Sequence, residues 1–169
     1  MAEAGLTLTH VRQDPEAPTL FSFCFLYPDG SGGNLTTGDS ACSHVDAALV
    51  AAAEPELSRL AGRGVALAAP EVSLDARAKL LELATRHGLF RVASFTSEEV
   101  GTALRLGLLG SVDLVALNLH EAATCAGLPV EGSAPEAIVE AALARLTAAQ
   151  AGILVAVTHG RHGSWTWDG

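Results

Sequence analysis

Short apolar runs alternate with helical segments over most of the chain. The runs fall at 64–69, 90–95, 112–118 and 152–158, and a fifth run begins at 164. The run at 64–69 is continuously apolar, which is typical of a strand buried on both faces. Residues with helical spacing fill the intervals between the runs. The alternation predicts βαβ crossovers, and hence an α/β fold with three layers (α/β/α), in which helices cover both faces of a mostly parallel sheet.

Capping signals mark where several helices begin. Ser73 is placed to cap a helix over 74–87, and the T-x-x-E sequence at 96–99 forms a capping box for the next helix. A second capping box is expected at 133–136. It would open a long helix that ends near Gln150 and has three inward side chains, Ile138, Ala142 and Leu146.

The first part of the chain departs from this alternation. Residues 19–27 are rich in aromatic and β-branched types, 28–30 are a Pro-Asp-Gly turn, and 34–37 can return as a second strand. We therefore divide the chain into a hairpin with its connection (1–44) and an α/β domain (45–169). Because a lone hairpin is marginally stable in water, we expect it to cover a substrate cleft or to form a homodimer with a second subunit's hairpin.

Composition excludes several classes of protein. Ten basic residues face 19 acidic ones, a net charge of −9, which argues against a nucleic-acid partner. No apolar run approaches the roughly 18 to 20 residues of a membrane-spanning helix. The N-terminus has no apolar signal core, and three widely spaced cysteines fit reduced thiols better than a disulfide framework. We expect a cytoplasmic protein with neither a membrane nor a nucleic-acid partner.

One candidate site follows the third apolar run. Asn118 and Glu121 lie where a buried parallel strand meets the first turn of its helix, the end of the sheet at which open α/β folds bind ligands. An amide and a carboxylate three residues apart can hold a hydrated Mg²⁺ or a phosphate ester. The alternative is purely local: Asn118 caps the helix and Glu121 completes a capping box.

A second candidate site follows the fourth run. Its glycines let backbone N–H groups approach an anion, and its side chains add donors; the loop consists of Thr158, His159, Gly160, Arg161, His162 and Gly163. The alternative is an ordinary tight turn between two strands. A metal site made by the two histidines is not favoured, because the loop offers no third ligand. Neither a GxxxxGK[ST] loop nor an HExxH helix is present.

Taken together, these segments resemble the ribokinase (PfkB-type) family of ATP-dependent carbohydrate kinases. The stretch VDLVALNLHEAATCAGL is similar to the family's N-x-x-E segment, and ILVAVTHGRHGSW is similar to its T-x-G-x-x-G segment. The initial hairpin resembles the family's lid. By this resemblance Asn118 and Glu121 would organise Mg²⁺ and the triphosphate, and the 158–163 loop would line the nucleotide pocket.

The chain departs from the family pattern at both ends. It has no counterpart of the amino-terminal sugar-binding motif or of the Gly-Ala-Gly-Asp segment that supplies the catalytic base. The resemblance implies a kinase for a sugar or sugar-like alcohol with ATP and Mg²⁺ as cofactors. We expect the chain to be an incomplete, ribokinase-like piece that is inactive alone, whether a truncated product, a misplaced start or a fragment completed by another polypeptide. The alternative function is a non-catalytic α/β module for binding or assembly.

Overall fold

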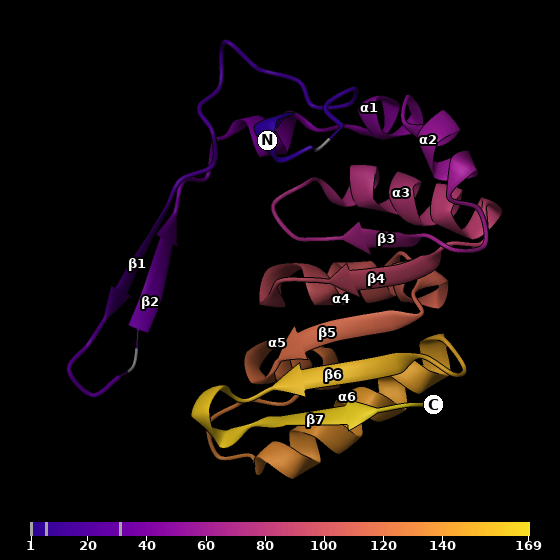
Figure 1. Ribbon diagram of the computed structural model, residues 1–169. Coiled ribbons are helices and arrows are strands. Elements are labelled where there is room, and N and C mark those ends of the chain that lie inside the picture. The colour runs from indigo at the N-terminus through magenta and orange to yellow at the C-terminus, as the bar shows by residue number, and fades with distance from the viewer. Residues whose placement is uncertain (1, 6, 31) are drawn as a thin grey trace.

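The computed structural model describes residues 2–5, 7–30 and 32–169 (Figure 1). Five strands form one sheet in the order β3-β4-β5-β6-β7. The first four strands are parallel and the last is antiparallel to its neighbour; they are β3 (Val65–Ala68), β4 (Phe90–Ser94), β5 (Leu114–Asn118), β6 (Leu154–Thr158) and β7 (Ser164–Trp167). The predicted α/β class and mostly parallel sheet are confirmed.

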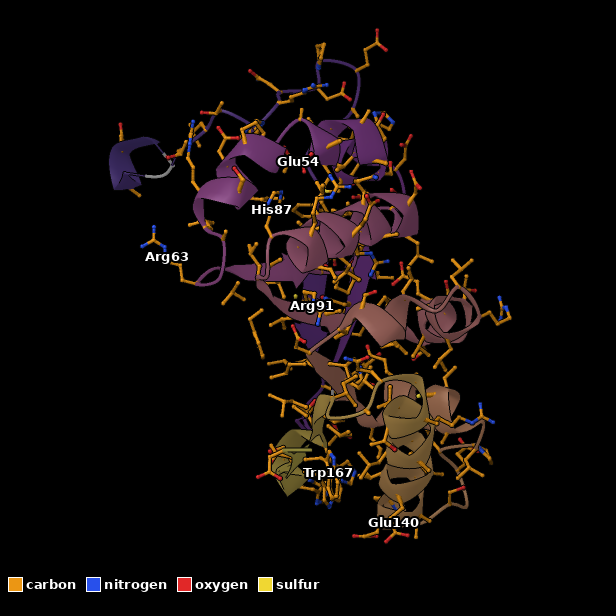
Figure 2. The ribbon with its side chains drawn as sticks, turned by 90° about the vertical axis from the view of Figure 1, so that its right-hand side faces the viewer. Glu54, Arg63, His87, Arg91, Glu140 and Trp167 are labelled. Carbon is orange, nitrogen blue, oxygen red and sulfur yellow. The ribbon has the colours of Figure 1, made fainter. Side chains whose placement is uncertain are left out.

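The helices that connect successive strands share one face of the sheet. They are α3 (Leu74–Arg86), α4 (Ser97–Arg105), α5 (Leu119–Ala126) and α6 (Pro135–Ala149), and Figure 2 shows them stacked to one side of the strands. The prediction that helices cover both faces is wrong for the connecting helices that the structure describes, because these lie on one face only. Because the strands are added in chain order from one edge of the sheet to the other, right-handed crossovers place every connecting helix on the same side. Helices cover both faces only when later strands are added in the opposite direction along the sheet.

The other face of the sheet is apolar and largely uncovered. One residue from each of the four parallel strands forms a row across this face; the register pairs Leu67 with Val92, Val92 with Leu114, and Leu114 with Leu154. Leu67 is 61% exposed and Val65 63% exposed. The first apolar run is therefore buried on one face only, contrary to the sequence prediction.

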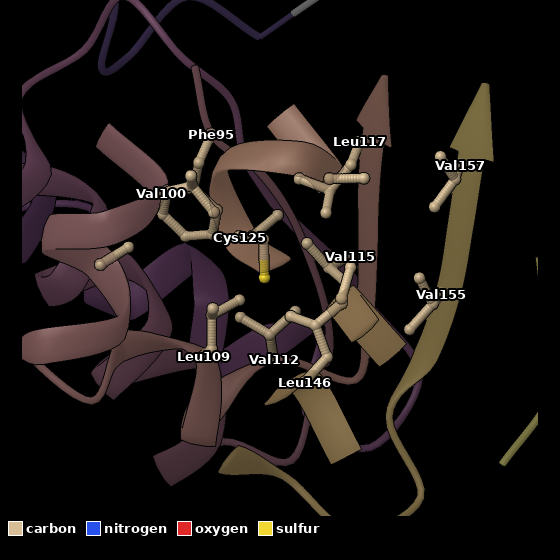
Figure 3. Close-up of a cluster of buried hydrophobic side chains, with 14 of the residues drawn as sticks. Phe95, Val100, Leu109, Val112, Val115, Leu117, Cys125, Leu146, Val155 and Val157 are labelled. Carbon is tan, nitrogen blue, oxygen red and sulfur yellow. The ribbon is translucent and has the colours of Figure 1, made fainter. Parts of the chain in front are cut away.

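The core lies between the sheet and these helices (Figure 3). Small side chains let the helices approach the strands closely, as at the fully buried Ala93 and Ala122. Larger side chains fill the remaining space, among them Phe95, Leu109 and Leu146. The three inward positions predicted for α6 are all fully buried.

The capping predictions are confirmed at two helices. The Ser73 hydroxyl accepts a hydrogen bond from the backbone N–H of Ala76 at 3.2 Å, and Thr96 and Glu99 form the predicted capping box of α4. The box predicted at 133–136 is wrong. Pro135 occupies the first helical position, so Ala134 and not Ser133 is the N-cap of α6, and the alanine side chain has no atom that can accept a hydrogen bond.

The hairpin forms as predicted. Strand β1 (Ser22–Leu26) pairs antiparallel with β2 (Gly32–Thr36), and the pair extends away from the sheet and its helices (Figure 1). Three large side chains on it stay exposed, namely Phe23 at 61%, Leu26 at 83% and Leu35 at 69%. The short helix η2 (Ala41–His44) connects the hairpin to the α/β domain.

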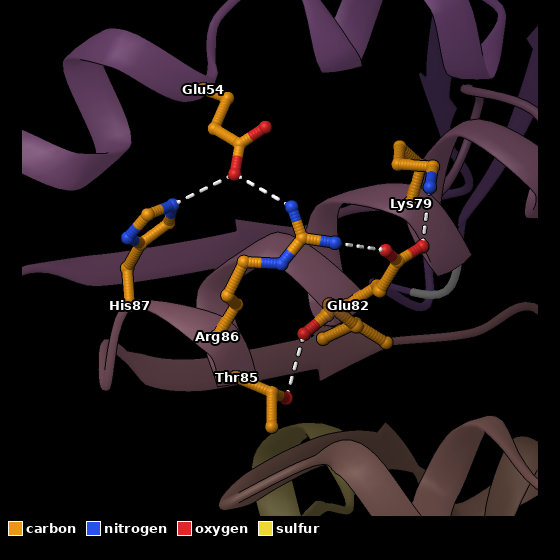
Figure 4. A network of polar contacts seen from close by, with 7 residues as sticks. Glu54, Lys79, Glu82, Thr85, Arg86 and His87 are labelled. Carbon is orange, nitrogen blue, oxygen red and sulfur yellow. Dashed lines mark hydrogen bonds and ion pairs between the residues drawn. The ribbon is translucent and has the colours of Figure 1, made fainter.

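Two short helices lie beyond the β3 edge, α1 (Ala47–Ala51) and α2 (Glu54–Arg59). A polar network holds α2 to α3: Glu54 Oε1 accepts hydrogen bonds from Arg86 at 2.7 Å and from His87 at 3.0 Å (Figure 4). The bond from Arg86 is the main cause that lowers the pKa of Glu54. Among the described residues, no helix is long and apolar enough to cross a membrane.

Candidate functional site

The two candidate segments meet at neighbouring strand ends. Asn118 is the last residue of β5 and Thr158 the last of β6, and the two are direct partners in the parallel register. The 158–163 loop therefore starts beside the first turn of α5. This juxtaposition at the carboxyl edge of the sheet is what the sequence predicted.

Asn118 and Glu121 form a reciprocal capping box at the start of α5. The Asn118 side-chain oxygen accepts from the Glu121 N–H at 2.9 Å, and the Glu121 carboxylate accepts from the Asn118 N–H at 2.7 Å. The local alternative weighed for this pair is thus present in the structure. It fixes the angle at which the chain leaves β5, and so it positions the residues that follow.

The 158–163 loop is a single turn of 3₁₀ helix, η4 (Gly160–His162), closed by backbone hydrogen bonds. The N–H of His159 donates to the carbonyl of Gly163 at 2.8 Å, and that of His162 donates to the carbonyl of His159 at 2.9 Å. Both glycines have positive φ, 51° at Gly160 and 98° at Gly163. A side chain at either position would be strained, so the glycines keep this backbone compact and bare.

A cavity of about 540 Å³ joins the two segments. Its size suits a small-molecule ligand. The lining comes from both strand ends and from the hairpin turn, and consists of Asp29, Gly30, Asn118, Leu119, His120, Val130, Thr158, His159, Gly160, Arg161 and His162.

Six of the eight predicted site residues line this cavity. Glu121 and Gly163 do not: the carboxylate of Glu121 turns back to the Asn118 N–H, and Gly163 closes the loop behind the wall. Sequence reasoning missed Asp29 and Gly30. The turn signal at 28–30 was visible, but the place of these residues in the cavity wall depends on the tertiary fold.

Direct coordination of a metal by protein side chains finds little support. In the part of the chain that the structure describes, no group of three or more His, Cys, Asp or Glu side chains is placed to hold a metal ion. Asn118 and Glu121 offer the hard oxygens that Mg²⁺ prefers, yet each already accepts a backbone hydrogen bond. A carboxylate has about four acceptor positions, so Glu121 retains capacity to bind a water of hydrated Mg²⁺.

The opposite end of the sheet carries a different polar group. Asp113 accepts hydrogen bonds from the backbone N–H of Arg91 at 2.7 Å and from its Nε at 2.8 Å. The guanidinium of Arg91 is the main cause that lowers the pKa of Asp113. This pair joins β4 to the start of β5 at the amino ends of the strands, far along the sheet from Asn118 and Thr158.

Solved structures share the fold over about half their length. The crystal structure of Sa239 matches with a TM-score of 0.74 and 18% identity, covering 99% of this chain and 52% of that one. Ribokinase from Giardia lamblia matches with a TM-score of 0.70 and 17% identity, covering 94% and 48% respectively. Adenosine kinase from Sinorhizobium meliloti matches with a TM-score of 0.68 and 23% identity, covering 90% and 45%.

The sequence comparisons give one positive result. None of the curated protein sequences matches the chain. The family described as pfkB family carbohydrate kinase matches residues 1–169. The chain therefore belongs to the pfkB carbohydrate kinase family.

Proposed function

We propose that the chain supplies the nucleotide-binding side of a cytoplasmic kinase that uses ATP and Mg²⁺ to phosphorylate a sugar or sugar-like alcohol. The observation that carries the proposal is the cavity at the carboxyl ends of β5 and β6. Two segments that resemble the family's motifs form part of its wall, at the edge of the sheet where α/β folds bind ligands. Family membership supports the reaction class.

The residues at this cavity would have separate roles in binding the phosphates and Mg²⁺. The backbone of Gly160 lies bare in the wall, so phosphate oxygens can approach it closely, and Arg161 adds a cation to the same wall. Asn118 and Glu121 hold the turn into α5, and Glu121 has acceptor capacity for a water on Mg²⁺. When bound, Mg²⁺ neutralises charge on the transferring phosphoryl group.

Turnover would need more than this chain. The chain spans about half the length of the structures it resembles, and its sequence contains no Gly-Ala-Gly-Asp segment. Phosphoryl transfer depends on positioning and on electrostatic stabilisation, so half of a site binds without reacting. We propose that the 169 residues bind Mg·ATP and do not phosphorylate a sugar by themselves.

A coupled ADP-release assay across pentoses, hexoses and nucleosides tests this proposal, in parallel with calorimetric titration of Mg·ATP. The expected result is binding without sugar-dependent ADP release. Sugar-dependent turnover that Glu121→Gln abolishes would show that the chain is active alone. Absence of Mg·ATP binding would refute the nucleotide-site proposal.

The second candidate function is assembly, and the exposed hairpin favours it. Phe23, Leu26 and Leu35 leave apolar surface on an element that stands apart from the core. A homodimer through this hairpin would bury them. Analytical ultracentrifugation at high micromolar concentration should then show a dimer that Phe23→Ser weakens.

The matched control for that experiment is Leu106→Ser, at a side chain that is 63% exposed where α4 ends. This substitution should leave the dimer intact. A strict monomer, or equal effects of the two substitutions, would contradict dimerisation through the hairpin.

A further inference from the structure

Three aromatic rings make successive contacts at the 158–163 loop. The imidazole of His159 is stacked near the indole of Trp165, with centroids 5.7 Å apart and planes 21° apart. The same imidazole lies 4.7 Å from the ring of His162, with the planes 34° apart. Both separations fall within the range of favourable ring pairs.

Trp165 and His162, the two outer rings, lie in different surroundings: the first contacts the core and the second lines the cavity. Trp165 lies on β7 and packs against the hydrophobic core, so it anchors one side of the group. His159 and His162 line the cavity, whereas Trp165 does not. The three rings thus extend from the core to the cavity wall, and we call them the ring column (Trp165, His159 and His162).

The chemistry of the ring column favours a flat, aromatic ligand over a metal ion. Two histidines alone make a weak metal site, and no third ligand is placed with them among the described residues. Flat rings held at small interplanar angles by a partly buried anchor, in contrast, can stack on any nucleobase, because every base has a π-face.

We propose that the ring column is a stacking platform for the base of a nucleotide, with His162 in contact with the base. His159 and Trp165 act as positioning residues that hold the ring of His162. The inference rests on the proposed nucleotide-binding function and deepens it, because it assigns recognition of the base to side chains of this loop. The phosphates would then lie toward Gly160 and Asn118, on the remaining polar wall of the cavity.

Isothermal titration with two probes, Mg·ATP and Mg·tripolyphosphate, tests the platform in the full 169-residue chain. The second probe has phosphates but no base. His162→Ala should weaken ATP binding by about five- to 150-fold, the range for loss of one base–aromatic stack, and leave tripolyphosphate binding unchanged. His159→Ala should reproduce this selective loss, because it removes the support for His162. His162→Phe should retain ATP affinity.

Glu140→Gln serves as the matched control, because Glu140 is exposed on α6 and does not line the cavity (Figure 2). It should change neither affinity. Equal losses for ATP and tripolyphosphate in His162→Ala would overturn the inference and assign the histidines to phosphate binding. Unchanged ATP affinity in that variant would also overturn it while the proposed function stands. Failure of the unaltered chain to bind either probe would overturn both.

Discussion

Arg77 offers the sharpest test of how the fold is held together. It lies on α3 and is 2% exposed, and its side chain reaches the first turn of α4. Its Nη1 donates to the carbonyl of Ser94 at 3.2 Å, its Nη2 pairs with the carboxylate of Glu99, and its guanidinium carbon lies 5.4 Å from the ring centre of Phe95. Arg77→Met keeps the apolar stem and removes the charge, leaving the carbonyl and the carboxylate without that donor.

The expected cost follows from those lost partners. One buried acceptor and one half-buried carboxylate lose their donor, which costs about 2–4 kcal/mol of unfolding free energy. For a chain of this size, that lowers the melting temperature by roughly 5–15 °C. Urea denaturation followed by circular dichroism measures the change.

Glu99→Gln is the matched variant. Its amide oxygen can still accept from the Thr96 N–H, which now donates to Glu99 at 3.1 Å, but its NH2 group then faces the Arg77 guanidinium, so the charge and the hydrogen bond to Arg77 are both lost. It should cost about 2–4 kcal/mol, because the buried guanidinium loses its carboxylate, and in a double-mutant cycle the two substitutions should be non-additive. If Arg77→Met unfolds at the same urea concentration as the unaltered chain, the bridge from α3 to α4 contributes nothing to stability.

Three other predictions concern the core, the uncovered face and the ion pair at the amino ends of the strands. Burial raises the pKa of the Cys125 thiol to about 11. At pH 8, Ellman's reagent should therefore modify the exposed Cys24 quickly and Cys125 only as the chain unfolds. Equal modification rates for the two cysteines would contradict the burial of the Cys125 thiol shown in Figure 3. Leu146→Ala should cost about 2–5 kcal/mol in urea denaturation, whereas Leu67→Lys on the uncovered face should change stability by less than about 0.5 kcal/mol, and a large loss at Leu67 would mean that this face is covered. Asp113→Asn should cost about 1–2 kcal/mol at pH 7. Because the folded pKa of Asp113 is lowered, its carboxylate stabilises the fold above the unfolded pKa of about 3.9 and loses that effect as pH falls through the folded value. Unfolding measured across pH 2–7 should show the difference between variant and unaltered chain vanish at the acid end, and a constant difference would contradict the ion pair.

The four parallel strands could be predicted because each lies in a short segment rich in apolar residues and bounded by turn residues or helix caps. The run at 152–158 contains all of β6, for example, and Ser73 marked the start of α3 within one residue. The face on which the helices lie could not be predicted. It depends on strand order, and no local pattern distinguishes a strand covered on one face from one covered on both.

Part of the candidate site could be predicted, because its residues directly follow predicted strands. Residues at strand ends fall at the carboxyl edge of any parallel sheet, so the juxtaposition of Asn118 and Thr158 followed from the pattern alone. The hairpin was expected to cover a cleft, but the place of Asp29 in the cavity wall could not be predicted, because segments some ninety residues apart form that wall together. The side-chain direction of Glu121 was open between two alternatives, and the capping geometry is the one present.

The central claim is that Mg·ATP binds at the carboxyl ends of β5 and β6. Backbone amide chemical shifts recorded while Mg·ATP is titrated into the ¹⁵N-labelled chain test it most directly. We expect saturable shifts at 118–121 and 158–163, with the amides of Gly62, Gly64 and Arg91 unchanged in the cavity at the other end of the sheet. Shifts confined to that opposite cavity, or no shifts at millimolar nucleotide, would show that Mg·ATP does not bind at the carboxyl ends of β5 and β6.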